Sequence, residues 1–440
     1  MRVLLVNPAS MSTFGALGIL FPPLGILYVA AAARDRGYEI KVVDRLVDRR
    51  TIDFSHFDVV GIHSDTTRFN SALNLAREAK AAGAKVVMGG PHPCFEAKGI
   101  LETGFVDAVV KGEGEESFPD LLDAWKSGED LSVIPGLVVM THQGVRDTGA
   151  SRRIQDVDSL PFPARDLVDL SKYARAHLGY RSLTPVHTSR GCPYGCRFCS
   201  STRFDGSEWR ARSAESTLDE LEYLVRKLGF GAVAFLDDNF TGSPARIHEI
   251  CDGILKKDLD VHWWCLSRVD TIVKHPKMVK HMAEAGAFSI FTGIETPSSD
   301  LLDHFRKRIN PDQAWEAINI LKEHGIETWG AYILGSPEEG RADIRSTIRF
   351  ARKMDTNIAQ FTLLTPYPGT ALYDELKDRI VVKDWSKYDG NHAVFKHPTI
   401  PRIELQLWSI WAYIAFYFRH RRSIAGFCRF LVNRMNMRDR

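Results

Sequence analysis

Three cysteines lie within eight residues of one another near the middle of this 440-residue chain. Cys192, Cys196 and Cys199 have the spacing Cys-x3-Cys-x2-Cys, and they are three of the seven cysteines in the sequence. Gly191 and Gly195 allow the backbone to turn closely around them. A loop of this kind can direct three sulfur atoms at one soft metal centre.

The spacing favours an iron–sulfur cluster over the alternatives. A structural zinc site usually has four Cys or His ligands, and no second pair of such ligands lies near these three. Buried or disulfide-forming thiols are the plainer alternative, but disulfides do not persist in a reducing cytosol. A cluster held by only three thiolates leaves one iron open for a further ligand, which suits catalysis better than electron storage.

The segment 188–199, including the aromatic Phe198 before the third cysteine, resembles the cluster motif of the radical S-adenosylmethionine (SAM) superfamily. This resemblance implies that Cys192, Cys196 and Cys199 hold a 4Fe-4S cluster whose open iron binds the amino and carboxylate groups of SAM. It further implies that an electron from the cluster cleaves SAM to a 5'-deoxyadenosyl radical. An external electron donor such as flavodoxin or ferredoxin is then required.

The composition is that of an ordinary globular protein, with 44% hydrophobic and 25% charged residues. The chain is long enough for two or three domains. Its net charge of +2 gives no overall attraction to nucleic acid. The N-terminus lacks the pattern of a secretory signal, and the cysteines outside the loop are scattered singly. We therefore expect a cytoplasmic protein.

Residues 1–130 alternate short Val-rich runs with helical patterns, which predicts an α/β fold with a doubly wound, Rossmann-like sheet. The expected elements are strands at 2–6, 39–43, 58–63 and 85–88 and helices at 24–36 and 70–82. Ligands of such sheets bind beyond the carboxyl ends of the strands. The loops at those ends are polar and glycine-rich, although ordinary tight turns are the alternative interpretation. No Gly-x-Gly-x-x-Gly follows the first strand, which disfavours a nicotinamide dinucleotide.

These loops, with Pro22-Pro23-Leu24-Gly25, resemble the cobalamin-binding domain that precedes many radical SAM domains. The resemblance implies that cobalamin contacts Ser64, Thr66, Gly89, Gly90, Pro91, His92, Gly112, Glu113 and Gly114. One departure is the absence of Asp-x-His-x-x-Gly, which in other cobalamin proteins supplies a histidine to the lower face of cobalt. His63 and His92 are the nearest candidates for that position, and a loop hydrogen bond is the simpler role for each.

Residues 131–183 are expected to form a linker with a small hairpin, and residues 184–380 a partial (β/α)6 barrel. Catalytic residues of such barrels lie at the carboxyl ends of the strands. The expected strands are 185–188, 232–236, 261–266, 288–291, 328–333 and 358–363. SAM carries an ammonium, a carboxylate, a sulfonium and a ribose diol, so its pocket needs acceptors, a cation and close backbone approach.

The residues that follow these strands include the acceptors, the cation and the glycines that such a SAM pocket needs. By resemblance to radical SAM barrels, Asp237 or Asp238 lies near the amino group of SAM, and Arg268 lies near its carboxylate or ribose. The same resemblance places Glu295 on the ribose side, and Gly335 and the backbone around Phe198 beside the adenine. For each acid, a helix cap or a surface ion pair is the alternative role.

Residues 381–440 are expected to form a helical C-terminal region. The segment 405–418 is apolar except for Gln406 and Ser409, and it is too short to span a bilayer. Seven arginines and one acid follow in residues 419–440. One interpretation is a helical cap on the barrel. The other is peripheral membrane contact through residues 405–440, which would give a lipid access to the barrel.

Over residues 1–380 the chain resembles the cobalamin-binding radical SAM group, which includes anaerobic magnesium-protoporphyrin ester cyclases and cobalamin-dependent methyltransferases. The resemblance implies a methyltransferase that acts on an unactivated carbon of a small or lipid-like substrate. Ring formation or oxidation without methyl transfer is the alternative. A non-catalytic corrinoid or metal sensor is a third hypothesis, against which the three cysteines argue.

Overall fold

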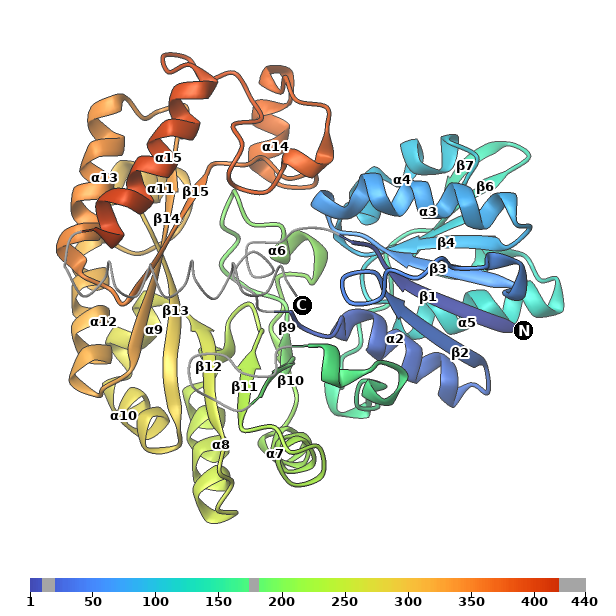
Figure 1. Cartoon of the computed structure of the whole chain (residues 1–440), viewed down its shortest axis with the longest axis horizontal. Coiled ribbons are helices and arrows are strands. Elements are labelled where there is room, and N and C mark those ends of the chain that lie inside the picture. Colours follow the sequence, from blue (N-terminus) through green and yellow to red (C-terminus); the bar gives the residue numbers. More distant parts are fainter. Residues whose placement is uncertain (10–19, 174–181, 419–440) are drawn as a thin grey trace.

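Two sheets, one in each half of the chain, organise the molecule (Figure 1). The computed structural model describes residues 1–9, 20–173 and 182–418. The first sheet has seven strands and the second has six, and a short two-stranded ladder of β9 (Ser189–Arg190) and β10 (Arg210–Ala211) lies between them. This arrangement confirms the predicted α/β class with two successive sheet domains.

The first sheet is doubly wound, as predicted. Along β1 (Arg2–Asn7), Val3 and Leu5 face one apolar cluster and Leu4 and Val6 face another, because alternate side chains leave a strand on opposite sides. Helices α2 (Leu24–Asp35) and α5 (Gly114–Ser127) cover the first face, and α3 (Phe69–Ala81) and α4 (Pro91–Glu102) cover the second. The other parallel strands are β2 (Glu39–Asp44), β3 (Val59–His63), β4 (Lys85–Gly89) and β5 (Ala108–Val110).

The hairpin expected in the linker belongs to this same sheet. Its strands are β6 (Leu137–Thr141) and β7 (Gly144–Asp147), and β6 pairs antiparallel with β5 so that Val109 lies opposite Val138. The strand order is β2-β1-β3-β4-β5-β6-β7. The first sheet therefore extends to residue 147, whereas the linker was expected to begin at residue 131.

The second sheet is parallel throughout, and its order β15-β14-β13-β12-β11-β8 follows the chain. Its strands are β8 (Leu183–Val186), β11 (Ala232–Phe235), β12 (His262–Ser267), β13 (Ala287–Glu295), β14 (Glu327–Leu334) and β15 (Ile358–Leu363). The helices packed along it include α7 (Ala214–Glu222), α8 (Pro244–Lys256), α9 (Val269–Lys274), α10 (Pro276–Glu284), α12 (Pro311–Glu323) and α13 (Arg341–Met354). Six parallel β/α units confirm the predicted partial barrel.

Helix α15 (Arg402–Tyr417) covers β15, the edge strand of this sheet. The Tyr413 hydroxyl accepts from the Phe361 backbone N–H and donates to the Phe361 carbonyl, both at 3.1 Å. Tyr417 makes the same pair of contacts with Ala359 at 3.2 and 3.1 Å. One side of the predicted C-terminal helix thus packs on the barrel. The arginine-rich segment 419–440 lies outside the described residues.

Candidate functional site

The cysteine loop leaves β9 at Gly191, where only glycine fits. Its φ is +82°, and a Cβ there would lie 2.1 Å from the Glu208 carbonyl oxygen. The Cys192 N–H donates to Gly206 O at 3.0 Å, which ties the start of the loop to the segment that follows it, and the Cys199 N–H donates to Cys196 O at 3.1 Å within the loop. All three cysteines are half-buried free thiols. The assignment of these three thiols as cluster ligands stays a prediction, and the structure places them in one partly sheltered loop.

The surroundings of the loop hold it in place and shield its sulfurs. The Arg197 N–H donates to Phe305 O at 3.0 Å, and the Phe198 ring meets the Phe305 ring edge-on with centroids 5.3 Å apart. Burial raises the pKa of Cys199 to about 11 and also raises that of Cys192. Thiols in such surroundings keep their protons until a metal replaces them. Three soft donors in a sheltered loop fit an iron–sulfur cluster.

The two aspartates after β11 face different ways. Asp237 is buried, and its Oδ1 accepts from Thr188 N and Oγ1 at 3.0 and 2.9 Å and from Ser189 Oγ at 2.5 Å. Its Oδ2 has no hydrogen-bond partner among the described residues. Asp238 instead lines a cavity and accepts from Ser201 Oγ at 2.8 Å. Desolvation by the surrounding protein raises the pKa of Asp238.

Arg268 lies against the cysteine loop. Its guanidinium carbon stands 3.4 Å from the centroid of the Tyr194 ring, within the range of a cation–π contact. Its Nε donates to Asp270 Oδ1 at 2.8 Å, and one terminal nitrogen donates to the Lys307 carbonyl at 2.9 Å. These contacts fix a nearly buried cation beside Cys192, and its predicted place near the carboxylate or ribose of SAM stays a prediction.

Glu295 has a strained backbone and a buried partner. Its φ is +65°, uncommon for a residue other than glycine, and it follows a register shift in the β13–β14 pairing. Its Oε1 accepts from Lys307 Nζ at 2.5 Å. Burial alone would lower the pKa of Lys307, but attraction to Glu295 raises it overall. Arg306 and Arg308, on either side of Lys307, also have positive φ, at 53° and 58°.

The loop after β14 turns at Gly335, whose φ is +81°. A Cβ there would lie 3.1 Å from Leu405 Cδ2 of α15. Ser336 N–H donates to Glu339 Oε2 at 2.8 Å, and burial raises the pKa of Glu339 to about 7. Gly335 follows the end of its strand at the same edge of the sheet as Asp237, Arg268 and Glu295. The buried Glu339 carboxyl group holds the backbone of this turn.

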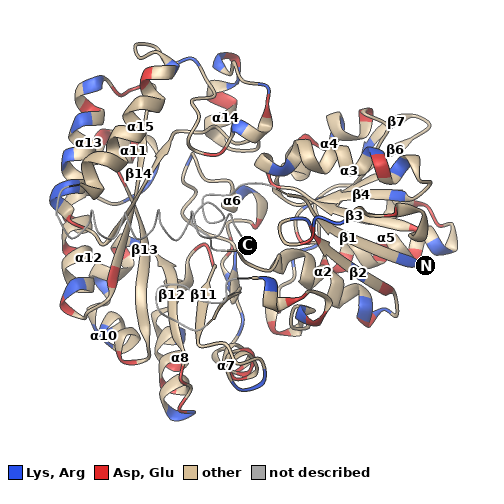
Figure 2. Cartoon of the chain, viewed as in Figure 1, with Lys and Arg blue, Asp and Glu red and all other residues tan. Residues whose placement is uncertain are grey.

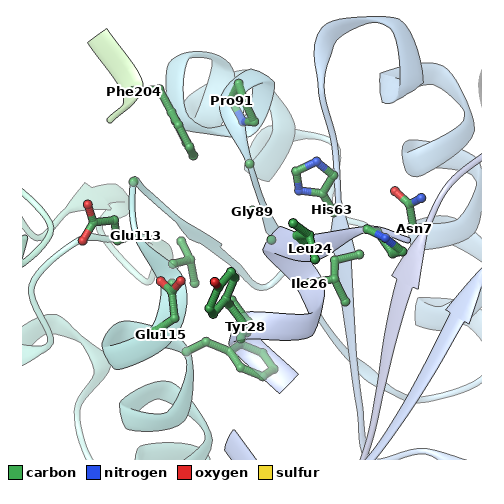
Figure 3. A pocket seen from close by; sticks show the side chains of 18 of the residues that line it. Asn7, Leu24, Ile26, Tyr28, His63, Gly89, Pro91, Glu113, Glu115 and Phe204 are labelled. Atoms are coloured by element: carbon green, nitrogen blue, oxygen red, sulfur yellow. The ribbon is translucent and has the colours of Figure 1, made fainter. Parts of the chain in front are cut away.

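A cavity of about 440 Å³ lies between the two sheets (Figure 3). Residues from the first domain form most of its wall, including Leu24, Tyr28 and His63. The barrel contributes His187, Ser189, Arg190, Phe204, Asp205, Leu236 and Asp238. The cavity thus reaches from the carboxyl ends of the first sheet to the vicinity of the cysteine loop.

Six of the residues predicted to contact cobalamin line this cavity: Gly89, Gly90, Pro91, Gly112, Glu113 and Gly114. Ser64, Thr66 and His92 are buried behind the wall and do not line it. The His92 ring packs between Phe69 and Trp385, with centroids 4.3 and 4.8 Å away. Of the two histidines considered for the lower face of cobalt, the structure brings only His63 to the cavity.

The cavity wall fits a large ligand that approaches the backbone closely. A Cβ on Gly90 would lie 2.7 Å from Ser64 O and 2.8 Å from the His63 ring, so a larger residue would close that side. Asn7 lines the cavity, and its buried Oδ1 has no partner among the described residues. Exposed backbone, apolar side chains and a few polar groups suit a corrinoid with amide side chains.

Sequence reasoning missed two cations of this site, one that joins the two domains and one within the barrel. Arg190, directly before the cysteine loop, bonds Glu115 and lies 3.5 Å from Glu113. Lys307 stands 5.8 Å from the centroid of the Phe198 ring and pairs with Glu295. In the sequence Lys307 is the centre of an Arg-Lys-Arg run, which is more typical of a solvated surface.

Fold and site together define an enzyme class in which a corrinoid domain faces an iron–sulfur domain that cleaves SAM. Residues 14–122 match the family model of the B12 binding domain, and residues 186–351 match that of the radical SAM superfamily. A protein of Pyrococcus horikoshii, described as "Uncharacterized methyltransferase PH0819", is 36% identical over 95% of this chain and 93% of its own length. The chain belongs to the B12-binding radical SAM family, whose cofactors are a 4Fe-4S cluster, SAM and cobalamin.

The chain is also similar to a curated enzyme and to a solved structure. The anaerobic magnesium-protoporphyrin IX monomethyl ester cyclase of Cereibacter sphaeroides is 28% identical over 92% of this chain and 68% of its own length. The solved structure of the methyltransferase TsrM from Kitasatospora setae, with cobalamin and a [4Fe-4S] cluster bound, superposes with a TM-score of 0.72. That match covers 86% of this chain and 78% of the other at 22% identity, so it establishes the shared fold.

Proposed function

We propose that this cobalamin-dependent radical SAM enzyme methylates an unactivated carbon of a small or lipid-like molecule. The observation that carries the proposal is the cavity shared by the two domains. Its wall runs from Gly89 and Gly90 in the first sheet to Asp238 beside the cysteine loop. A corrinoid in the first part of this space would therefore lie close to the place where SAM is cleaved.

The residues of the chain have distinct parts in this proposal. Cys192, Cys196 and Cys199 hold the cluster. Asp238 and Arg268 offer an acceptor and a cation to the amino acid portion of SAM, and the Glu295–Lys307 pair borders the same loop. When bound, the cluster with SAM supplies a carbon-centred radical and the corrinoid supplies a transferable methyl group.

The chain's own contribution is to orient the reactants and to exclude water and oxygen. The Phe198 ring covers the cysteine loop against Phe305, and Phe204 and Leu236 form apolar parts of the cavity wall. Tyr28 closes another part, and its hydroxyl donates to the His187 carbonyl at 3.3 Å. Such a wall keeps a radical away from solvent while the substrate carbon is held in position.

A radical cyclisation or oxidation without methyl transfer is the second candidate. The observation that favours it is the 28% identity, over nearly the whole chain, to a magnesium-protoporphyrin ester cyclase. Both reactions would form the deoxyadenosyl radical. Only methyl transfer would consume a second SAM and release S-adenosylhomocysteine in proportion to product.

The enzyme needs a reductant, and we propose a small electron carrier such as flavodoxin or ferredoxin as its partner. The net charge of +2 gives no reason to expect nucleic acid as a further partner. The apolar outer face of α15 is the feature that supports a lipid-like substrate met at a membrane surface. No helix in the described residues is both long and apolar enough to cross a bilayer.

The first test needs no knowledge of the substrate. Protein purified without oxygen from cells supplied with cobalamin should contain about one corrinoid per cluster, as one cavity and one cysteine loop require. After reduction, SAM should yield S-adenosylhomocysteine in proportion to the bound corrinoid. Cluster without corrinoid would contradict methyl transfer. Replacement of all three loop cysteines with Ala should abolish formation of 5'-deoxyadenosine, and retained cleavage would refute their assignment.

A further inference from the structure

The outer side of α15 is apolar along its whole length. Every exposed residue between Arg402 and Tyr417 is a large hydrophobic one. They are Ile403, Leu407, Ile410, Trp411 and Ile414, which are 74, 58, 56, 52 and 42% exposed. Their spacing places them on one side of the helix, and we call them the α15 stripe.

The stripe is unusual on this molecule. The described residues contain thirteen exposed large hydrophobic side chains, and five of them belong to the stripe. Most of the others are single residues in separate elements, which is normal for a protein surface. The opposite side of α15 is already occupied, because it buries Leu405, Ser409, Ala412 and Phe416. On the flank of the helix, Tyr413 and Tyr417 bond the backbone of β15. The stripe is therefore not needed to hold the helix on the barrel.

Positive charge borders the stripe on the neighbouring helix. Helix α13 packs against α15 and has five exposed basic residues against one exposed acid, Asp343. Figure 2 shows Lys and Arg along α13. The basic residues are Arg341, Arg345, Arg349, Arg352 and Lys353. Arg341 pairs with Glu404 at 2.6 Å, and the guanidinium of Arg345 stands 5.4 Å from the Trp408 ring centroid.

We propose that the α15 stripe lies in the surface of an anionic membrane, with the arginines of α13 at the lipid headgroups. An apolar helix face beside basic side chains is the combination that binds such surfaces. At 16 residues α15 is about 24 Å long, shorter than the bilayer core of about 30 Å, so it lies along the surface and does not cross it.

A second copy of the chain fits the stripe less well. A symmetric dimer through α15 would bring two α13 helices with the same charge toward each other. The sequence that follows α15, residues 419–440, adds seven arginines and one acid to each copy. Anionic lipids neutralise both sets of charges, whereas a second copy doubles them.

Flotation of the full-length, cofactor-loaded protein with lipid vesicles tests this proposal. Vesicles of phosphatidylcholine with phosphatidylglycerol should carry the protein, and the double variant Leu407→Glu with Ile410→Glu should reduce the bound fraction about tenfold. Val133→Glu, at a single residue that is 73% exposed in the first domain, is the matched control and should bind as the unaltered chain does. Arg349→Glu with Arg352→Glu should weaken binding to anionic vesicles.

Three results would overturn the proposal. They are no flotation at low salt, flotation that the α15 substitutions leave unchanged, and a concentration-dependent dimer that those substitutions dissociate without any vesicle binding. The second result would assign lipid binding to basic residues outside the stripe. Release of 5'-deoxyadenosine from SAM, measured in the same variants without vesicles, should be unaffected. Failure of membrane binding is thereby distinguished from failure of the proposed reaction.

Discussion

Glu113 of the first domain and Arg210 of the second form a buried, two-pronged ion pair. One guanidinium nitrogen of Arg210 donates to Glu113 Oε2 at 3.2 Å, and the other donates to Oε1. Both side chains are about 95% buried. Glu113 Oε2 also accepts from Ile154 N–H at 2.9 Å. The carboxylate at the cavity wall therefore also fixes the position of the first domain against the barrel.

Substitution of Glu113 should loosen the two domains. Glu113→Ala leaves the Arg210 guanidinium buried without its carboxylate, which costs about 3–5 kcal/mol when one partner of such a pair is removed. We expect faster proteolysis between the domains and loss of corrinoid during purification, with the iron content retained. Glu116→Ala, at an exposed position in the first turn of helix α5 that follows Glu113, is the control. Equal proteolysis rates for the two variants would show that the pair does not join the domains.

Gly90→Ala should damage the corrinoid site. The residue has φ of +104°, and the added methyl group would meet Ser64 O and the His63 ring at less than 3 Å. The strain amounts to about 1–3 kcal/mol, and the shift of His63 would narrow the cavity. Corrinoid per cluster, read from visible absorption and iron analysis, should fall. Gly99→Ala, within helix α4 that follows Gly90 and with open space around it, should keep a full complement of corrinoid. A normal corrinoid content in Gly90→Ala would show that this part of the cavity wall does not belong to the corrinoid site.

The sequence was most informative where the evidence is contiguous. The Val-rich runs that predicted parallel strands lie within single elements, and the three cysteines share one loop, so both predictions needed no partner from elsewhere in the chain. The β6–β7 hairpin was also recognisable, but its attachment to β5 depends on pairing between distant residues.

The orientation of side chains and long-range charge pairs could not be read from the sequence. Asp237 and Asp238 are neighbours in sequence, yet Asp237 binds Thr188 and Ser189 while Asp238 faces the cavity. The pairing of Glu113 with Arg210 spans 97 residues, and that of Glu295 with Lys307 depends on a turn with positive φ on both sides of the lysine. No local pattern indicates such contacts.

Arg268 gives a direct test of the proposed SAM site. Arg268→Ala removes a cation that the Tyr194 ring and Asp270 hold beside the cysteine loop. A charged hydrogen bond to SAM contributes about 1.5–3 kcal/mol, so the dissociation constant for SAM should rise at least about tenfold. Equilibrium dialysis with cluster-loaded protein measures it. The exposed Arg203, also close to the loop in sequence, supplies the control Arg203→Ala. Unchanged SAM affinity in Arg268→Ala would show that Arg268 only supports the loop.

Stability should fall on mild acidification because of His92. Burial lowers the pKa of this side chain to about 4, whereas an unfolded histidine titrates near 6.5. Between these values the unfolded chain takes up a proton that the folded chain does not, so the free energy of unfolding decreases as pH falls. The loss should be about 2 kcal/mol from pH 7 to pH 5, measured by urea titration. The loss of stability should be correspondingly smaller in His92→Phe. His56→Gln, at an exposed histidine, should lose as much stability as the unaltered chain.

The tyrosine hydroxyls of α15 should protect the edge strand of the barrel from local opening. Each hydroxyl of Tyr413 and Tyr417 satisfies both the N–H and the carbonyl of one residue of β15, which otherwise has no neighbouring strand on that side among the described residues. Tyr413→Phe leaves the two backbone groups of Phe361 without that partner, at a cost of about 1–3 kcal/mol. Hydrogen exchange of the Phe361 amide should accelerate in Tyr413→Phe. In Tyr417→Phe, exchange of the Ala359 amide should accelerate instead. Tyr223→Phe, on an exposed tyrosine, is the control. Unchanged exchange in both α15 variants would mean that packing of Phe416 and its neighbours, and not the hydroxyls, protects this edge.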